Sequence, residues 1–194
     1  EQLPLPAAAA HGTFVAPTII EIKKLGDLQR EVFGPVLHVI RFRRADLDRL
    51  IDDINASGYG LTFGLHTRLD ETIAHVTSRI KAGNLYVNRN IVGAVVGVQP
   101  FGGRGLSGTG PKAGGPLYLH RLLARDPAGP MPGLAPPADA AFDAYVAWLE
   151  QGGRGDIAGR CRRYRERSLT GRVLELPGPV GERNFYLCEA RGIV

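Results

Sequence analysis

The stretch GGRGLSGTG, residues 102 to 110, contains the spacing G-x-G-x-x-G at Gly103, Gly105 and Gly108. In dinucleotide-binding turns such glycines let the backbone approach a pyrophosphate held at the N-terminus of the next helix. That chemistry needs a buried strand before the glycines and a helix directly after them. Here Pro100 precedes the glycines and TGPKAGGP follows, which disfavours both elements. The spacing alone therefore does not predict a dinucleotide-binding turn.

Two cysteines and a cluster of arginines are the other candidates for chemistry. Cys161 and Cys188 share no C-x-x-C or metal-ligand spacing, which predicts reduced structural thiols and no metal site. A reactive thiol at Cys161, which has positive neighbours, is the alternative. Arginines crowd residues 160–172, where Glu166 alone opposes them locally. A solvated helix face or a surface that docks on another domain is favoured over a nucleic-acid patch, because no RNA-binding signature accompanies them.

Composition and length set the broad class. The chain has 194 residues, of which 44% are hydrophobic and 22% charged, which is typical of a globular protein. No apolar run approaches the ~18 residues of a membrane span, and no signal peptide opens the sequence, so a cytoplasmic protein is expected. The only methionine is Met131, so Glu1 is not a natural start. We therefore expect a piece of a longer chain.

Strand and helix patterns alternate along the first part of the chain. Strands are predicted at residues 18–22, 36–42, 61–66 and 84–88. Helices are predicted after caps at Asp46 and near Asp70, the second ending at Gly83. The strand VLHVIRF at 36–42 is apolar enough to be covered on both faces.

This alternation predicts an α/β fold with a parallel sheet and crossover helices. Ligands bind at the carboxyl ends of strands in such sheets, and the loop from Asn88 to Gly110 leaves from such an end.

The second part of the chain begins after a Pro/Gly-rich stretch, residues 123–138, which reads as a linker. Asp139 is placed to cap a helix. The apolar stripe of this helix is Phe142, Tyr145, Val146 and Leu149. A basic helical segment follows, and RVLEL and NFYLCE then predict a hairpin or strand pair. Residues 139–194 are expected to be the truncated beginning of a second α/β unit.

Several motifs resemble those of one enzyme family. EVFGPV, residues 31–36, resembles the E-[IV]-F-G-P-V motif of NAD(P)-dependent aldehyde dehydrogenases, and GNLYVNRN and QPFGGRGLSGTG follow in the family's order. Residues 88–116 are more particularly similar to L-glutamate γ-semialdehyde (1-pyrroline-5-carboxylate) dehydrogenases, above all to the version inside bacterial bifunctional proline utilization A proteins. The resemblance covers residues 10–122, and LPGPVGERN weakly resembles the C-terminal domain of the longer chains of that group. It implies that residues 1–122 are the C-terminal half of an aldehyde dehydrogenase catalytic domain.

The resemblance implies a cofactor site at the EVFGPV motif. In the family the motif's glutamate, here Glu31, accepts hydrogen bonds from the nicotinamide ribose. A carboxylate suits two vicinal hydroxyls because it has two acceptor oxygens. The motif's aromatic residue, here Phe33, lies near the nicotinamide. Taken alone, EVFGP would be as readily a strand-entry turn with a buried phenylalanine.

The resemblance also implies a substrate site. Gly93 and Ala94 match the loop that anchors the far end of the semialdehyde, which carries a carboxylate and an ammonium. Backbone N–H groups of small residues can approach such a carboxylate closely. Phe101 matches an aromatic residue that packs on the aliphatic middle of the substrate. Without the flanking motifs, residues 91–98 would read as a small-residue strand.

The family's chemistry needs residues that this sequence lacks. A cysteine attacks the aldehyde, hydride passes to NAD⁺, and a glutamate-activated water releases the acid. Both catalytic residues lie upstream of the E-x-F-G-P motif in the family, so no catalytic residue is expected in this chain. Cys161 and Cys188 come after the substrate loop.

The implied whole protein oxidises L-glutamate γ-semialdehyde to L-glutamate with NAD in proline catabolism. FAD is expected only in its missing proline dehydrogenase part. The rest of the parent chain and a homo-oligomer are the expected partners, with no nucleic acid bound by this segment and no membrane span. The alternative is a non-catalytic truncated protein that binds or assembles through its arginine-rich tail.

Overall fold

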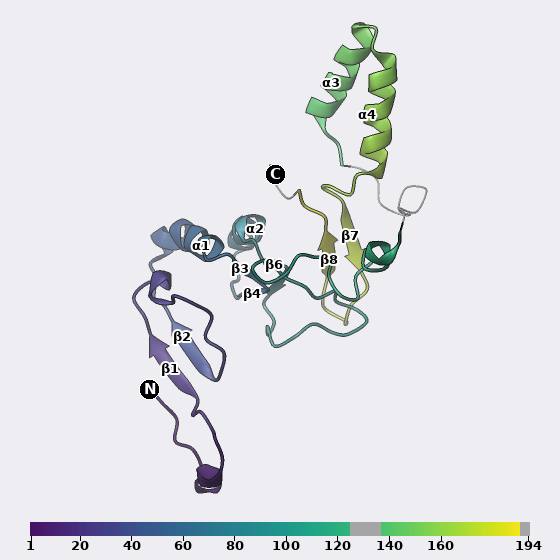
Figure 1. Ribbon diagram of the computed structural model, residues 1–194. Helices are drawn as coiled ribbons and strands as arrows, with labels where there is room; N and C mark the ends of the chain where they lie inside the picture. The colour runs from purple at the N-terminus through teal and green to yellow at the C-terminus, as the bar shows by residue number, and fades with distance from the viewer. Residues whose placement is uncertain (125–136, 191–194) are drawn as a thin grey trace. The chain divides into compact units, whose positions relative to one another are not determined.

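The computed structural model describes residues 1–124 and 137–190, and Figure 1 shows their helices and strands. Residue contacts divide the chain into two compact units. The first unit is made of residues 1–91 and 103–109, and the second of residues 92–102 and those from 110 onward. Residues 125–136 of the predicted linker at 123–138 lie outside the described residues, so the conformation of that part stays a prediction.

The first unit alternates strands and helices as the sequence predicts. Its elements are β1 (Thr18–Glu21), β2 (Val36–Val39), α1 (Leu47–Ala56), β3 (Tyr59–Gly60), β4 (Thr62–Leu65), α2 (Asp70–Arg79), β5 (Asn84–Val87) and β6 (Arg104–Gly105). Short 3-10 helices lie at Ala7–His11, Leu25–Asp27 and Arg44–Asp46.

The strands of the first unit form short sheets of two strands each. β4 and β5 pair in parallel, with α2 as the crossover between them, and β1 and β2 also pair in parallel. The α/β class with parallel pairing is therefore confirmed. A single sheet through β2, β4 and β5 is not found among the described residues, because β2 pairs with β1 instead. A parallel connection needs about a dozen residues, which residues 22–35 supply without an α-helix.

The two helices of the first unit share a small apolar core. Ile51 of α1 is 2% exposed and Val76 of α2 is 1% exposed, and Ile80 completes the buried cluster. Partly buried apolar side chains surround it: Leu47, Ile54, Phe63, Leu65, Ala82 and Leu85. The predicted i, i+3, i+4 spacing on 47–54 thus faces the β4–β5 pair and α2. This core fixes the ends of the strands from which the candidate substrate loop departs.

The helix ends differ from those expected. The Asp46 carboxylate does not cap α1, because it binds the Arg43 guanidinium (3.0 Å) across a 3-10 turn. Asp70 is the first residue of α2 rather than its cap. α2 ends at Arg79 instead of near Gly83, since the Asn55 amide donates to the Arg79 carbonyl (3.0 Å) and accepts from the Lys81 N–H (2.8 Å). One side chain from α1, that of Asn55, therefore satisfies backbone groups at the end of α2 where a glycine was expected.

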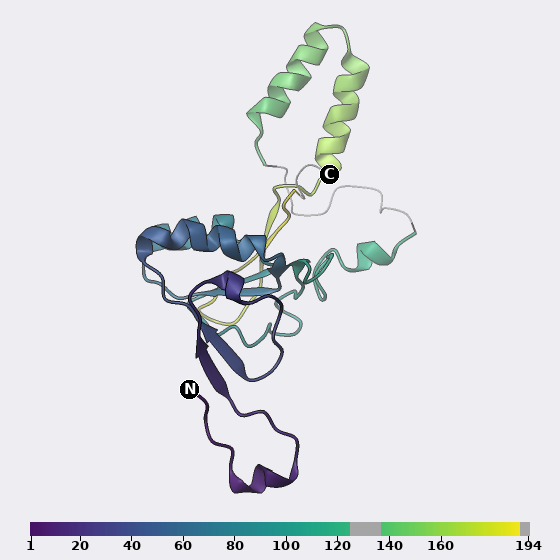
Figure 2. The same ribbon diagram turned by 60° about the vertical axis from the view of Figure 1, so that its left-hand side comes forward.

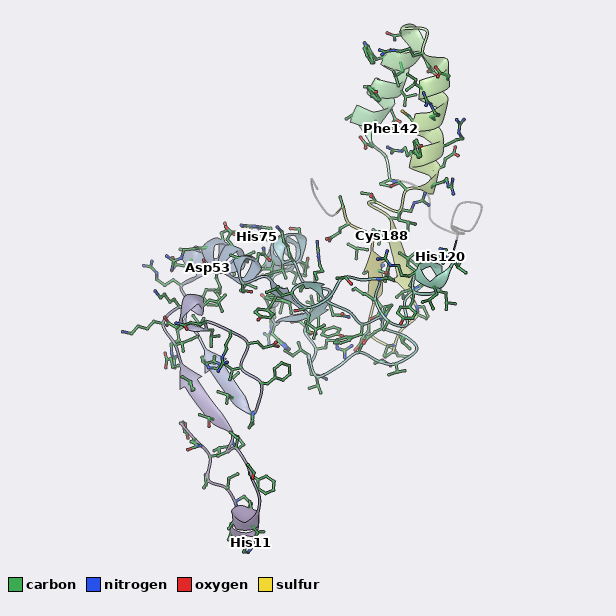
Figure 3. The ribbon with its side chains drawn as sticks, viewed as in Figure 1. His11, Asp53, His75, His120, Phe142 and Cys188 are labelled. Carbon is green, nitrogen blue, oxygen red and sulfur yellow. The ribbon has the colours of Figure 1, made fainter. Side chains whose placement is uncertain are left out.

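Ion pairs also join α1 to α2 on their solvent side. The Arg79 guanidinium contacts Asp48 (2.6 Å) and Asp52 (2.8 Å). His75, which Figure 3 labels on α2, also contacts Asp48. The hydrogen bond with His75 is the main reason why the pKa of Asp48 is lowered, and Arg79 lowers it further. Exposed ion pairs of this kind add little to stability, so the apolar core carries the packing of the two helices.

The β1–β2 pair is not covered on both faces by the described residues. β2 ends at Val39 rather than at Phe42, and Leu37 at its centre is 58% exposed. The expectation of a fully covered strand is therefore wrong for this chain, because a sheet of two strands offers no neighbouring layer that could bury both faces.

The second unit contains a helical hairpin and a strand pair. Its elements are a 3-10 helix at Leu119–Leu122, α3 (Ala140–Gln151), α4 (Gly155–Arg167), β7 (Val173–Leu176) and β8 (Asn184–Leu187). Figures 1 and 2 both show α3 and α4 side by side. β7 and β8 are antiparallel, which confirms the predicted strand pair. The connection at 177–183 is too short for a parallel crossover.

One face of α3 packs on α4. Leu149 is 1% exposed and Val146 is 5% exposed, and both contact Ala158 of α4 in one buried cluster. Phe142, labelled in Figure 3, also packs there. The predicted stripe is therefore correct except for Tyr145, which is 48% exposed and stacks on Trp148.

Asp139→Ala is expected to lower the thermal stability of α3 in the full-length parent. The Asp139 carboxylate accepts from the Phe142 N–H (3.0 Å), as a helix cap does, and lies 3.4 Å from the Arg165 guanidinium. The Phe142 hydrogen bond, helped by Arg165, lowers the pKa of Asp139 in the folded protein. The stabilisation is therefore full above the unfolded pKa of about 3.9 and is lost progressively as the pH falls from there through the lower pKa of the folded protein.

Thermal unfolding followed by circular dichroism at pH 7 and at pH 3 checks this. Asp139→Asn, which keeps an acceptor oxygen, is the matched control and should retain most of the stability at pH 7. An equal loss for Asp139→Ala at both pH values would contradict the capping role.

Candidate functional site

The EVFGPV segment forms an exposed loop between the 3-10 helix at Leu25–Asp27 and β2. Glu31 is exposed, and no hydrogen bond to its carboxylate is found among the described residues. The Phe33 side chain is 89% exposed. The alternative of a turn with a buried phenylalanine is therefore wrong within this chain. Both side chains are accessible to a bound molecule.

The backbone after Phe33 fixes this loop against β1. Gly34 has φ +135°, a conformation that L side chains rarely adopt. The Pro35 carbonyl accepts from the Thr18 N–H (2.9 Å), which starts the parallel ladder of β1 and β2. The loop that carries Glu31 therefore ends at a defined point on the sheet.

Asn88 sets the direction in which the chain leaves β5. It has φ +56°, and its side chain makes two hydrogen bonds with the Thr67 backbone, one to the N–H and one to the carbonyl (both 3.0 Å). Its own N–H donates to the Leu65 carbonyl (2.8 Å). Asparagine is one of the few non-glycine residues that adopt this backbone conformation readily. These bonds tie together the carboxyl ends of β4 and β5.

Residues 91–98 form a loop with a turn and not the small-residue strand that was the alternative. The Val95 carbonyl accepts from the N–H groups of Val98 (3.1 Å) and Gln99 (2.8 Å), and Gly97 has φ +81°. Gly93 lies just before this turn, and a Cβ built on it would meet nothing within 4 Å. Ala94 is half-buried beside it. The Cβ side of Gly93 is therefore open.

Phe101 follows this loop and is held by backbone pairing. It forms an isolated antiparallel bridge with Ala113, with hydrogen bonds of 3.0 and 2.9 Å between the two backbones. Its side chain is 37% exposed. Phe101 thus belongs with Gly93 and Ala94 to the second unit, whereas Glu31 and Phe33 belong to the first.

The glycine-rich turn after Phe101 packs against protein backbone. A Cβ on Gly105, which has φ +58°, would lie 2.4 Å from the Gly58 carbonyl oxygen, and one on Gly103 would lie 2.3 Å from that of Ser107. β6 pairs with β3 here, and the Ser107 hydroxyl accepts from the Gly60 N–H (3.1 Å). No α-helix follows the turn within residues 106–124. Gly105 allows close packing onto Gly58 and Gly103 allows close packing within the turn itself, so these two glycines serve backbone contacts of the protein.

Comparison with known proteins identifies the family. The family profile described as "Aldehyde dehydrogenase family" matches residues 3–125. The chain belongs to the aldehyde dehydrogenase family.

Several members of the family are close relatives. A Rhizobium meliloti protein named "Bifunctional protein PutA" is 66% identical over 99% of this chain and 16% of its own length. A Bacillus subtilis 1-pyrroline-5-carboxylate dehydrogenase is 44% identical over 56% of this chain and 21% of its own length. A crystal structure of a Bradyrhizobium japonicum proline utilization A (PutA) variant superposes with a TM-score of 0.56 at 58% identity, covering 60% of this chain and 12% of that one. The chain thus spans about a sixth of the PutA relative that it matches over almost its full length.

The aldehyde dehydrogenase motifs do not account for the arginines of the second unit. Three of them form ion pairs in the helical hairpin: Arg160 with Asp156 (3.4 Å), Arg162 with Glu150 (2.6 Å) and Arg165 with Asp139 (3.4 Å). Arg172 is 2% exposed and donates to the Ser168 carbonyl (2.6 Å). Glu166 is the only acidic residue among residues 160–172, and these three arginines pair instead with acidic residues that lie earlier in the chain.

The two cysteines lie in partly buried positions. Cys161 packs against the buried cluster of α3 and α4. Burial raises the pKa of the Cys188 thiol, although Arg172 opposes the rise. Both cysteines are free. A reactive thiolate is favoured by a lowered pKa, so Cys188 does not fit that role.

No group of histidine, cysteine or acidic side chains in residues 1–124 and 137–190 is arranged to hold a metal ion. No helix in the same residues is long and apolar enough to span a membrane.

Three residues of the second unit were not foreseen from the sequence. The Gln99 amide nitrogen donates to the Asn184 side-chain oxygen (2.9 Å) and to the Glu182 carboxylate (3.1 Å). Nothing in the local pattern marks these residues, because they are common surface types and lie more than eighty residues apart in sequence. A polar network this distant is visible only in the folded chain.

Proposed function

We propose that this chain is part of an NAD-dependent dehydrogenase that oxidises L-glutamate γ-semialdehyde to L-glutamate in proline catabolism. The observation that carries the proposal is the open loop at Gly93, within a region that is 44% identical to a 1-pyrroline-5-carboxylate dehydrogenase. The 66% identity to a bifunctional PutA protein supports a longer parent that also carries a proline dehydrogenase with FAD. We expect that parent to be a cytoplasmic homo-oligomer, and the free cysteines support this location.

The Glu31 loop fits the nicotinamide cofactor. The Glu31 carboxylate is exposed and has two acceptor oxygens for the two hydroxyls of a ribose. The exposed Phe33 ring supplies an apolar surface beside it. NAD⁺ held there would supply the hydride acceptor that the oxidation needs. Glu31 would hold the nicotinamide ribose, and Phe33 would hold the nicotinamide ring in place.

The Gly93 loop fits the charged end of the substrate. No atom lies within 4 Å of the position where a Cβ of Gly93 would stand, so a carboxylate would meet no side chain on that side of the residue. Phe101, partly exposed and held by its bridge to Ala113, offers an apolar surface to the aliphatic middle. Recognition of the substrate's charged end would then select against simple aldehydes.

The full-length parent tests this function. We expect NADH formation with L-glutamate γ-semialdehyde at a much higher kcat/KM than with an uncharged aldehyde of similar length. Equal kcat/KM values for the two aldehydes would overturn the assignment of residues 93–94 as the anchor.

The 194-residue chain alone is expected to give no turnover. The family's nucleophile and base lie upstream of the motif at Glu31, and the two cysteines of this chain have the structural surroundings described above. NADH production by the purified chain, measured against a boiled sample, checks this. Activity that disappears on changing Cys161 or Cys188 to serine would contradict it.

A further inference from the structure

The side chain of Gln99 closes the turn of the candidate substrate loop. Its amide oxygen accepts from the Val95 N–H (2.9 Å), while its own backbone N–H donates to the Val95 carbonyl (2.8 Å). Residues 95–98 are thus held at both backbone groups of Val95. Gly93 and Ala94 directly precede this turn, and Val95, the residue that Gln99 holds, follows Ala94.

The other end of the Gln99 amide is held by the strand pair β7–β8. Its nitrogen donates to Asn184, the first residue of β8, and to Glu182, in the connection before it. The orientation of the amide follows from chemistry, because the Val95 N–H can only donate and so must face the oxygen. The nitrogen then faces two acceptors. Both of these contacts are partly buried.

A second set of contacts holds the same strand pair close to residues 112–115. Tyr186 of β8 is 8% exposed, and its ring lies 3.3 Å from where a Cβ on Gly115 would be. The Lys112 ammonium lies 5.7 Å from the centre of that ring. Ala113, between them, forms the bridge to Phe101. The strand pair therefore supports the loop at its turn and at its far end.

We propose that β7–β8 positions the substrate-anchor loop, with Glu182 and Asn184 fixing Gln99 and Gln99 fixing the turn next to Gly93. This inference rests on the proposed function, in which Gly93 and Ala94 receive the substrate carboxylate. Gln99, Glu182 and Asn184 are positioning residues, since they act through the loop and not on the reacting atoms.

Reversing the hydrogen bond gives a sharp test. Gln99→Glu keeps the oxygen for Val95 but sets a carboxylate against Glu182, so the two repel. Adding Glu182→Gln restores the hydrogen bond in the opposite direction, because the new amide at position 182 can donate to the new carboxylate at position 99. The Asn184 amide can turn to donate, since its nitrogen is buried without a partner as the protein stands.

The experiment uses the full-length parent with four variants: Gln99→Glu, Glu182→Gln, the double variant, and Gln151→Glu as a control. Gln151 is an exposed residue at the end of α3, so it receives the same chemical change without the network. KM and kcat are measured for L-glutamate γ-semialdehyde and for an uncharged aldehyde of similar length, together with NAD⁺ affinity and thermal stability.

We expect Gln99→Glu to raise KM for the semialdehyde by roughly threefold to tenfold, the size of one ordinary hydrogen bond. KM for the uncharged aldehyde and NAD⁺ affinity should not change, and the double variant should recover the wild-type KM. Gln151→Glu should resemble wild type, whereas Glu182→Gln, which keeps an acceptor oxygen for Gln99 but loses its charge, should raise KM for the semialdehyde less than Gln99→Glu does.

A wild-type KM for Gln99→Glu, or an equal rise for both aldehydes, would overturn the inference. If Gln99→Glu does not fold, recovery of soluble protein with wild-type KM in the double variant supports it, and failure to recover overturns it. Failure of the proposed function is separate, because wild type itself would then show no preference for the semialdehyde.

Discussion

Gly93→Val in the full-length parent is expected to raise KM for L-glutamate γ-semialdehyde by roughly tenfold to hundredfold. The space in front of Gly93 is open, and its backbone is outside the left-handed region, so a side chain fits the folded protein. The valine side chain would, however, keep the substrate carboxylate away from the backbone of residue 93. The loss of one hydrogen bond to a charged group, about 1.5–3 kcal/mol, corresponds to that factor.

Steady-state kinetics with charged and uncharged aldehydes check this prediction, and Gly93→Ala should give a smaller rise in KM. Gly26→Val is the matched control, because Gly26 is equally open and lies in the first unit, in a short 3-10 helix. Thermal stability should change little in any of these variants. A wild-type KM for Gly93→Val would show that the carboxylate binds elsewhere.

Glu31→Gln in the parent is expected to weaken NAD⁺ binding by roughly fivefold to thirtyfold. The substitution keeps the shape and one acceptor oxygen but removes the charge, and charge-assisted hydrogen bonds are about twice as strong as neutral ones. The expected loss is about 1–2 kcal/mol, taken from the ~1.5–3 kcal/mol of bonds to charged groups. No hydrogen bond of Glu31 within the described residues is lost, so folding should be unaffected.

Calorimetric titration of NAD⁺ and single-turnover NADH formation measure this effect. Release of the acid should be spared, because a different glutamate activates water in the family. Glu71→Gln, at an exposed position in the first turn of α2, controls for the loss of one negative charge. If Glu31→Gln binds and reduces NAD⁺ as wild type does, Glu31 is only a turn residue.

Helices and strands could be predicted where the pattern of apolar or β-forming residues lies within one segment. The apolar spacing in 47–54 gives α1 its buried face, and the β-formers at 61–66 and 84–88 become β4 and β5 with ends shifted by a residue or so. Pairing was less predictable, because it depends on partners outside the segment. The pattern of β2 does not reveal that β1 is its neighbour, nor does Asp46 reveal that Arg43 competes for its carboxylate.

The residues of the candidate site could be predicted from the sequence, but the contacts that hold them in place could not. The motifs at 31–36 and 88–116 resemble those of a family, and so point to Glu31 and Gly93 without any knowledge of their surroundings. The exposure of Glu31 and the open space at Gly93 appear only in the structure. The Gln99 contacts join residues that no periodicity relates, since hydrogen bonds between distant polar side chains leave no pattern in a sequence.

The route of the chain between β5 and β6 bears on how substrate range can change. The backbone leaves the first unit at Ile91 and re-enters it at Gly103, where β6 pairs with β3. The intervening residues are therefore an insertion with both ends fixed, and lengthening such an insertion costs little free energy. A loop from an enzyme with another substrate could replace residues 92–98 and leave the helices and strands of the first unit intact. Gln99 lies outside these residues and would keep its contacts with Glu182 and Asn184, so the transplanted loop would need to offer a backbone N–H at position 95 to the Gln99 oxygen. The substrate range could then change by exchange of the loop alone, while the strand pair that supports it stayed the same.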